Sequence, residues 1–317
     1  ILKISIMNHL KKYPFLLFPL FLVIIYIINP FNLFVSGNEL SFISLVISCI
    51  IIELFIQKAK NGEEIYMRPI AAMTAMEEAV GRATEMGSPV LYVPGISGLD
   101  EIDTISGVMI LGHVAGMTAE YEANLHVPCC VPIVMEAAKE SCKEAYLKKG
   151  RPDLYNENMV HYVTDDQFAY AAGVNGIMLR EKPAAVFYQG KFYAESLLLA
   201  ETGSSVGALQ IAGTGSSSQI PFFVTACDYV LIGEEFYAAS AYLSGSPEMI
   251  GSIKGQDYVK LACMVFIGFT VFMSILNFLI PKFFLTLQNL YKWFLVTDFS
   301  IWIPFEFINF IFRTSII

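Results

Sequence analysis

A short stretch rich in glycine and serine is the first candidate for chemistry in this sequence. It reads GTGSSS between two apolar runs, and its members are Gly213, Thr214, Gly215, Ser216, Ser217 and Ser218. Glycines let a backbone approach a ligand closely, and a helix that follows offers free N–H groups to a phosphate. The stretch has neither the lysine of a P-loop nor the third glycine of the dinucleotide fingerprint.

The cations nearest to this stretch are far away along the chain. No Lys or Arg lies between Lys191 and Lys254, so a bound phosphate would have no cationic partner close in sequence. Three interpretations stay open: a strand-to-helix turn with Ser or Thr as the N-cap, a site for an anion or nucleotide, and a subunit contact.

Two adjacent carboxylates, Asp165 and Asp166, form the second candidate. They follow a predicted strand and could hold Mg²⁺, which binds through one or two carboxylates together with phosphate oxygens. Together with the glycine–serine stretch, the two aspartates and Mg²⁺ would form a site for a nucleotide or other phosphate-bearing ligand, and this site would need no lysine. The alternative is helix capping, because Asp is common at helix N-termini.

The remaining reactive residues form no catalytic set. The histidines of the central region have no metal-binding spacing, and the cysteines form no CxxC pair. The adjacent pair Cys129-Cys130 is either a thiol switch or two buried small residues. We therefore predict no catalytic residue and favour a protein that is not an enzyme, with an enzyme acting at the same sheet edge as an alternative.

These candidates are positioned by a regular alternation of strands and helices. Predicted strands cover residues 89–93, 124–127, 159–163, 184–188, 208–212 and 229–232. Predicted helices cover residues 70–86, 102–123, 132–149, 166–172, 193–201, 218–227 and 234–243. Alternation of this kind predicts an α/β fold, a mostly parallel, Rossmann-like sheet with helices on both faces.

In an open parallel sheet, ligands bind beyond the carboxyl ends of the strands. Five segments follow predicted strands and should share this edge: residues 94–98, 128–130, 164–167, 213–218 and 233–235. Gly95 lies in the first of them and is a predicted ligand contact together with the glycine–serine stretch.

Both ends of the chain are more apolar than a soluble protein allows. The 317 residues are 55% hydrophobic with a mean hydropathy of +0.56. Residues 15–28, 40–56 and 261–280 are predicted membrane spans, and residues 283–317 an interfacial or re-entrant helix, or a fourth span. The predicted organisation is a transmembrane hairpin at 1–57, an α/β domain at 58–259, and a transmembrane helix with the interfacial or re-entrant helix at 260–317.

Charged residues predict the orientation. Lys11, Lys12, Lys58 and Lys60 flank the first two spans, while residues 29–39 between them carry no Lys or Arg. The positive-inside rule then puts the middle domain in the cytoplasm, on a protein integral to the cell membrane. Residues 58–259 hold 13 Lys and Arg against 25 Asp and Glu, a net charge of −12. This charge disfavours nucleic acid as a partner.

Several long segments resemble a prokaryotic family of membrane proteins. They are EEAVGRATEMGSPVLYVPG (77–95), TDDQFAYAAGVNGIMLREKPAA (164–185), FYAESLLLAETG (192–203), IAGT (211–214), FFVTACDYVLIGEEFYAASAYLS (222–244) and GSIKGQD (251–257). Members of this family carry one domain of unknown function between terminal membrane segments. The resemblance covers the middle domain and implies no activity and no catalytic residue.

The leading hypothesis is a membrane-anchored assembly or scaffold protein that forms a homo-oligomer through its α/β domain. It rests on the absence of a catalytic motif and on many small residues, as in AYAAGVNG (169–176) and AASAYLSGS (238–246). Its partners would be the lipid bilayer, further copies of the chain and other membrane-protein subunits. The alternative is a sensor that binds a nucleotide or other small molecule, with Mg²⁺ as its cofactor.

Overall fold

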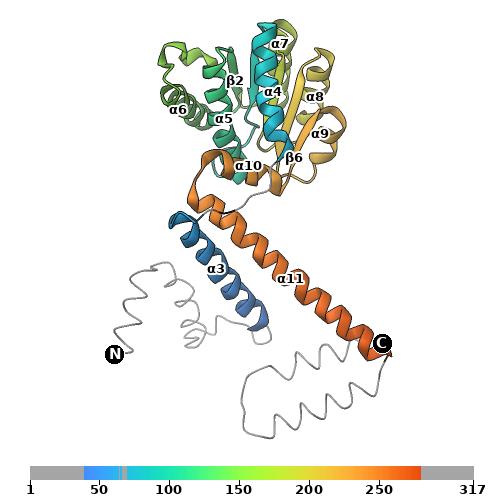
Figure 1. The fold of residues 1–317 in the computed structure, drawn as a ribbon. Coiled ribbons are helices and arrows are strands. Elements are labelled where there is room, and N and C mark those ends of the chain that lie inside the picture. Colours follow the sequence, from blue (N-terminus) through green and yellow to red (C-terminus); the bar gives the residue numbers. More distant parts are fainter. Residues whose placement is uncertain (1–38, 64, 66–69, 280–317) are drawn as a thin grey trace, which may run out of the picture. The chain divides into compact units, whose positions relative to one another are not determined.

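Figure 1 shows the computed structural model, which describes residues 39–63, 65 and 70–279. The predictions for residues 15–28 and 283–317 lie outside these described residues. By its contacts the chain divides into two compact units. One is formed by Ala59–Ile250, and the other includes the described residues up to Lys58 and from Gly251 onward.

The first unit is built on a sheet of six strands, all parallel. Their order across the sheet is β3-β2-β1-β4-β5-β6. The strands are β1 (Val90–Val93), β2 (Leu125–Cys129), β3 (Val160–Tyr162), β4 (Ala185–Gln189), β5 (Leu209–Thr214) and β6 (Tyr229–Ile232). The chain runs outward from β1 to β3, returns to the centre, and runs outward again from β4 to β6. The predicted parallel sheet is confirmed.

Helices cover both faces of this sheet (Figure 1). One face packs against α4 (Ala71–Met86), α5 (Ile102–Glu120), α6 (Pro132–Lys148) and α10 (Glu234–Ser244). The other packs against α7 (Gln167–Glu181), α8 (Glu195–Ser205) and α9 (Ile220–Ala226). Two 3₁₀ turns, η2 (Pro152–Leu154) and η3 (Glu157–Met159), connect α6 to β3.

The two central strands are buried along their whole length because helices cover both of their sides. Tyr92 and Phe187 point into one core, while Leu91 and Tyr188 point into the other. Full burial of an apolar side chain such as Leu91 or Phe187 stabilises the fold by about 1.5–3 kcal/mol. The buried phenols keep hydrogen bonds: the Tyr188 hydroxyl donates to the Leu199 carbonyl at 2.9 Å.

Three described helices are long and apolar enough to cross a membrane: α3 (Glu39–Lys60), α5 and α11 (Pro247–Leu279). In α5, 67% of the most apolar window is buried inside the protein, against 6% in α3 and 0% in α11. The composition of α5 is therefore explained by packing on the sheet, whereas the apolar surfaces of α3 and α11 are exposed. These two helices supply candidate membrane spans near both ends of the described chain.

Two glycines spaced by four residues allow α3 and α11 to touch. A Cβ atom on Gly251 would lie 2.5 Å from Ile56 Cα, and one on Gly255 would lie 2.6 Å from Ile52 Cα. Small residues at this spacing let helix backbones approach closely in membranes. Next to them, the rings of Phe55 and Tyr258 stack at 4.5 Å between centroids.

Two elements continue past the glycine at which they were predicted to end. The α7 helix runs through Gly173 to Glu181, and the β5 strand runs through Gly213 to Thr214. At both positions a neighbouring side chain fills the space where a Cβ would lie, so the glycine serves packing and does not end the element. The β2 strand likewise extends to Cys129, beyond the predicted residue 127.

Candidate functional site

The order of the strands reverses between β1 and β4, which is where doubly wound sheets bind ligands. Here the two loops that leave these strands touch each other. The backbone N–H of Ile96 donates to the Lys191 carbonyl at 3.0 Å. Gly95 has a φ of +79°, and a Cβ on it would lie 2.5 Å from that carbonyl oxygen. The predicted ligand contact Gly95 therefore serves the close approach of two loops.

The glycine–serine stretch is divided between a strand and a turn. Gly213 and Thr214 end β5, and Gly215–Ser218 form the turn that leads to α9. A Cβ on Gly213 would overlap the Gln189 side chain and lie 2.7 Å from a ring carbon of Phe236. Gly213 is thus required by the packing of protein side chains.

The turn is held by its own hydroxyl groups. The backbone N–H of Ser216 donates to Thr214 Oγ1 at 3.2 Å, and the Ser216 and Ser218 hydroxyls lie 3.1 Å apart. The prediction of a Ser or Thr N-cap is wrong, because Gln219 occupies that position without a side-chain cap. Its side chain is engaged elsewhere, with Oε1 2.7 Å from the Ser196 hydroxyl.

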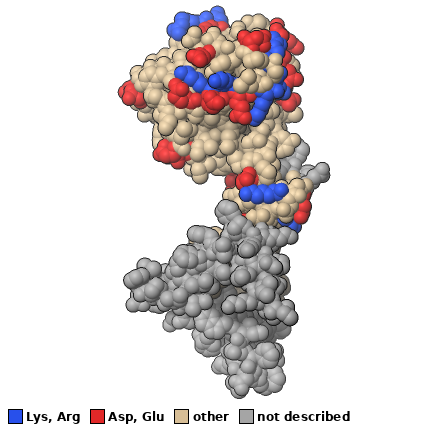
Figure 2. Space-filling view, turned by 90° about the vertical axis from the view of Figure 1, so that its left-hand side faces the viewer, with Lys and Arg blue, Asp and Glu red and all other residues tan. Residues whose placement is uncertain are grey.

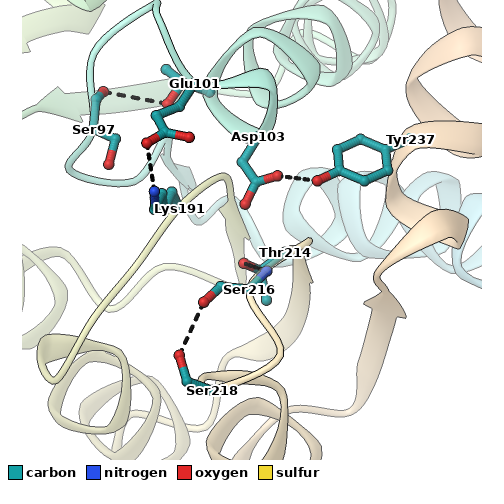
Figure 3. A network of polar contacts seen from close by, with 9 residues as sticks. Ser97, Glu101, Asp103, Lys191, Thr214, Ser216, Ser218 and Tyr237 are labelled. Atoms are coloured by element: carbon teal, nitrogen blue, oxygen red, sulfur yellow. Dashed lines mark hydrogen bonds and ion pairs between the residues drawn. The ribbon is translucent and has the colours of Figure 1, made fainter. Parts of the chain in front are cut away.

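The buried Asp103 and the half-buried Tyr237 fill the space beside this turn (Figure 3). Asp103 lies in the first turn of α5, is 7% exposed, and accepts a hydrogen bond from the Tyr237 hydroxyl of α10. Burial and this hydrogen bond raise the pKa of Tyr237, so its phenol stays protonated and donates. A Cβ on Gly215 would overlap the Tyr237 hydroxyl and lie 2.6 Å from Asp103 Oδ1.

Lys191 brings a cation to this edge that sequence reasoning missed. Its loop is tied to the end of β5, since the Gly190 N–H donates to the Gly213 carbonyl at 2.9 Å. The Lys191 ammonium forms an ion pair with Glu101 at 2.5 Å, and the hydrogen bond to Glu101 raises the pKa of Lys191. Figure 3 shows this pair beside the turn. The Lys191 ammonium is close to the turn in space, although Lys191 precedes Gly215 by 24 residues in the sequence.

Asp165 and Asp166 are exposed and lie beyond β3 at one end of the sheet. Asp166 accepts a hydrogen bond from the Ala169 N–H at 2.8 Å, so it caps α7 as the alternative interpretation predicted. Four strand spacings of roughly 4.8 Å each separate β3 from β5, about 19 Å. The structure does not bring the two aspartates and the glycine–serine stretch together. Among the residues described, no group of three or more His, Cys, Asp or Glu could hold a metal ion.

A second polar network, also missed from sequence, connects α7, α8 and the turn. Glu195 is fully buried and accepts hydrogen bonds from the Gln167 amide and from the Tyr193 N–H, the latter at 2.8 Å. The next residue, Ser196, contacts Gln219, which donates to Ser218 at 3.3 Å. Many polar groups of this edge are therefore already bonded to one another.

The cysteines behave as buried small residues. Cys129, Cys130 and Cys142 are buried and free of disulfides. Burial raises the pKa of Cys130 to about 11 and those of Cys129 and Cys142 to about 12. Because the thiolate is the reactive form, these thiols are inert at neutral pH, which disfavours a thiol switch.

Taken together, these features define an α/β protein with a six-stranded parallel sheet, a carboxyl edge occupied by its own side chains, and apolar helices near both ends. The chain belongs to the family described as a domain of unknown function (DUF6754), which matches residues 30–284. This range extends beyond the α/β domain over α3 and α11, whereas the resemblance stated from sequence covered the middle domain alone. Comparison with curated proteins gave no match. Comparison with solved structures gave none either.

Proposed function

We propose that this protein is a membrane-anchored assembly protein whose α/β domain docks a second copy of the chain through the carboxyl edge of its sheet. The apolar helices α3 and α11 would anchor it in the lipid bilayer. Lysines beside the first two predicted spans favour a cytoplasmic position for the α/β domain.

The observation that carries this proposal is a set of exposed apolar side chains where helices begin. Ile102 is 67% exposed, Ile133 61% and Phe168 58%, each in the first turn of its helix. We call this set the carboxyl rim, and it also includes Tyr193, Leu198 and Phe222. Grouped apolar side chains on a surface mark sites of interaction.

The polar groups that the rim surrounds favour a protein partner over a small ligand. Neighbouring protein atoms fill the space beside Gly95 and Gly215, and Asp166 caps a helix. The Lys191 ammonium is paired with Glu101. Affinity at this edge would then come from apolar burial on the rim.

The test is the mass of the intact complex in detergent, measured for the wild type and two matched pairs of variants. Ile133→Glu and Phe168→Glu place a charge on the rim, while Leu147→Glu and Leu179→Glu place one at the far ends of the same helices. The control positions are as exposed as the rim positions, at 55% and 57%. We expect an oligomer that only the rim variants dissociate. A monomeric wild type at every concentration, or equal effects of all four variants, would refute the proposal.

Salt distinguishes a second copy from a basic partner. Exposed carboxylates such as Asp100 and Asp165 follow strands on the same edge, so two copies facing each other repel. Salt screens exposed charges, and self-association should therefore strengthen as the ionic strength rises. Weaker association in salt would instead indicate a basic protein partner.

One observation favours the sensor as a second candidate. The strand order reverses between β1 and β4, and polar side chains gather at that reversal. Native mass spectrometry and thermal shift with ATP, in the presence and absence of Mg²⁺, test this role. No shift in the wild type, or an unchanged shift in Lys191→Gln combined with Glu101→Gln, would exclude it.

A further inference from the structure

A pocket of about 280 Å³ opens at the amino edge of the sheet, opposite the carboxyl rim. It lies between the start of β2, the α6 helix and the 3₁₀ turns that follow α6. These turns belong to the light green loop of Figure 1. The side chains used below are Asn124, Leu125, Tyr146, Asn156, Asn158 and Met159. None of them takes part in the site at the carboxyl edge.

The floor of this pocket is apolar and well packed. Leu125, Tyr146 and Met159 are 3%, 2% and 9% exposed. The Tyr146 hydroxyl lies 3.3 Å from Thr118 Oγ1, and its ring meets Tyr155 edge-on at 6.0 Å between centroids. These contacts hold the floor in place.

The mouth carries three exposed carboxamides, those of Asn124, Asn156 and Asn158. Asn156 Oδ1 accepts the Asn158 N–H at 3.0 Å, which fixes one amide and leaves its Nδ2 group available. Within the described chain, the side-chain amides of Asn124 and Asn158 form no hydrogen bond. The mouth therefore offers neutral donors and acceptors.

The charged groups beside the mouth are paired with each other. Arg151 binds Glu122 at 2.7 Å and Asp153 at 3.5 Å. The imidazole of His126 contacts the Glu181 carboxylate at 3.3 Å. Figure 2 likewise shows positive and negative side chains next to each other on one face of the domain. Glu122 has a φ of +56°, a left-handed conformation that is uncommon for a residue other than glycine. This conformation ends the α5 helix, because the Ala123 N–H donates to the Thr118 carbonyl at 2.9 Å, an arrangement common at helix C-termini.

We propose that this pocket binds a small, uncharged polyol of monosaccharide size. A hydroxyl group both donates and accepts hydrogen bonds, which matches the two halves of a carboxamide. Arg151, the cation beside the mouth, is already paired with Glu122 and Asp153, so a phosphate or carboxylate would compete with two carboxylates for it. The volume lies at the lower limit of small-molecule pockets, about 300 Å³, so a single sugar ring fits and a nucleotide does not.

The experiment is saturation-transfer NMR on the full-length protein, in a detergent without a sugar headgroup. Glucose and myo-inositol are the probes, and glucose 6-phosphate is the charged comparator. We expect saturation transfer to at least one of the two polyols, with a Kd of about 1 mM, and weaker transfer to the phosphorylated sugar. Asn156→Leu combined with Asn158→Leu should reduce the affinity at least tenfold.

Asn61→Leu is the control, because Asn61 is an exposed asparagine in a turn and does not line the pocket. A circular dichroism spectrum and melting temperature close to wild type establish that the double variant is folded. If it is not, the single variant Asn124→Leu replaces it. Transfer to neither polyol, stronger transfer to glucose 6-phosphate, or an equal loss in Asn61→Leu would overturn the proposal.

Discussion

Tyr237 of α10 donates a hydrogen bond to Asp103 of α5, across 134 residues of sequence. The bond joins the last helix of the α/β domain to the first helix after β1. It also occupies the space beside Gly215, where the sequence predicted a ligand. This hydrogen bond therefore explains why residue 215 is a glycine and why the Asp103 carboxylate is buried, without any bound molecule.

We predict that Gly215→Ala destabilises the α/β domain by about 1–3 kcal/mol, the usual effect of overpacking. The new methyl group would overlap the Tyr237 hydroxyl, so the loss should be smaller in a Tyr237→Phe background. Chemical denaturation of the four proteins in the double-mutant cycle measures this coupling. Gly81→Ala, at a helix position with no atom within 4 Å, should stabilise instead. Additive effects of Gly215→Ala and Tyr237→Phe would contradict the prediction.

The second prediction concerns the contact between α3 and α11. Gly255→Leu should separate the helices, because the position of its Cβ lies 2.6 Å from Ile52 Cα. Gly268→Leu is the matched control on the same helix, with no atom within 4 Å. The measurement is the rate of disulfide formation between Phe55→Cys and Tyr258→Cys, with Cys49 and Cys263 replaced by Ser. We expect a slower rate for Gly255→Leu and an unchanged rate for Gly268→Leu, and equal rates would exclude the packing role.

The third prediction is a pH dependence of stability. Burial, and secondarily the nearby His126, lowers the pKa of His161 below its ordinary value of about 6.5. The unfolded chain then binds more protons than the folded one near that pH, so stability falls as the pH decreases below about 6.5. Melting temperatures between about pH 7.5 and 5.5 should decline less in His161→Gln than in the wild type. Parallel declines would show that His161 makes no contribution.

The alternation of strands and helices predicts the α/β fold because a sheet covered on both faces requires it. The β6 strand and the beginning of α6 are predicted to the residue, since apolar runs and a first-turn proline mark them. Glycine is the residue that leads to wrong predictions of where a helix or strand ends. Gly173 resembles a helix end in sequence, yet α7 continues through it, and the glycine leaves room for the Val163 side chain.

The candidate site shows the same limit of prediction from sequence: local features are predicted, and contacts between distant residues are not. Asp166 is predicted as a cap because capping depends on local sequence. Tyr237 and Lys191 are missed because their partners, Asp103 and Glu101, are 134 and 90 residues away. A carboxylate next to a glycine turn indicates either a ligand or a distant side chain of the same chain, and only the tertiary contacts distinguish them.

The strand order also determines when the fold can be completed during synthesis. The central pair joins Val90–Val93 to a strand that ends at Gln189, almost a hundred residues later. Until the ribosome has delivered that strand, β1 has an open, wholly apolar edge, and such an edge pairs readily with other chains. Because non-local pairing in parallel sheets forms slowly, the nascent chain would remain vulnerable to aggregation for as long as the first half-sheet stands alone. Variants that slow β4 docking should therefore reduce yield before they reduce the stability of the finished protein.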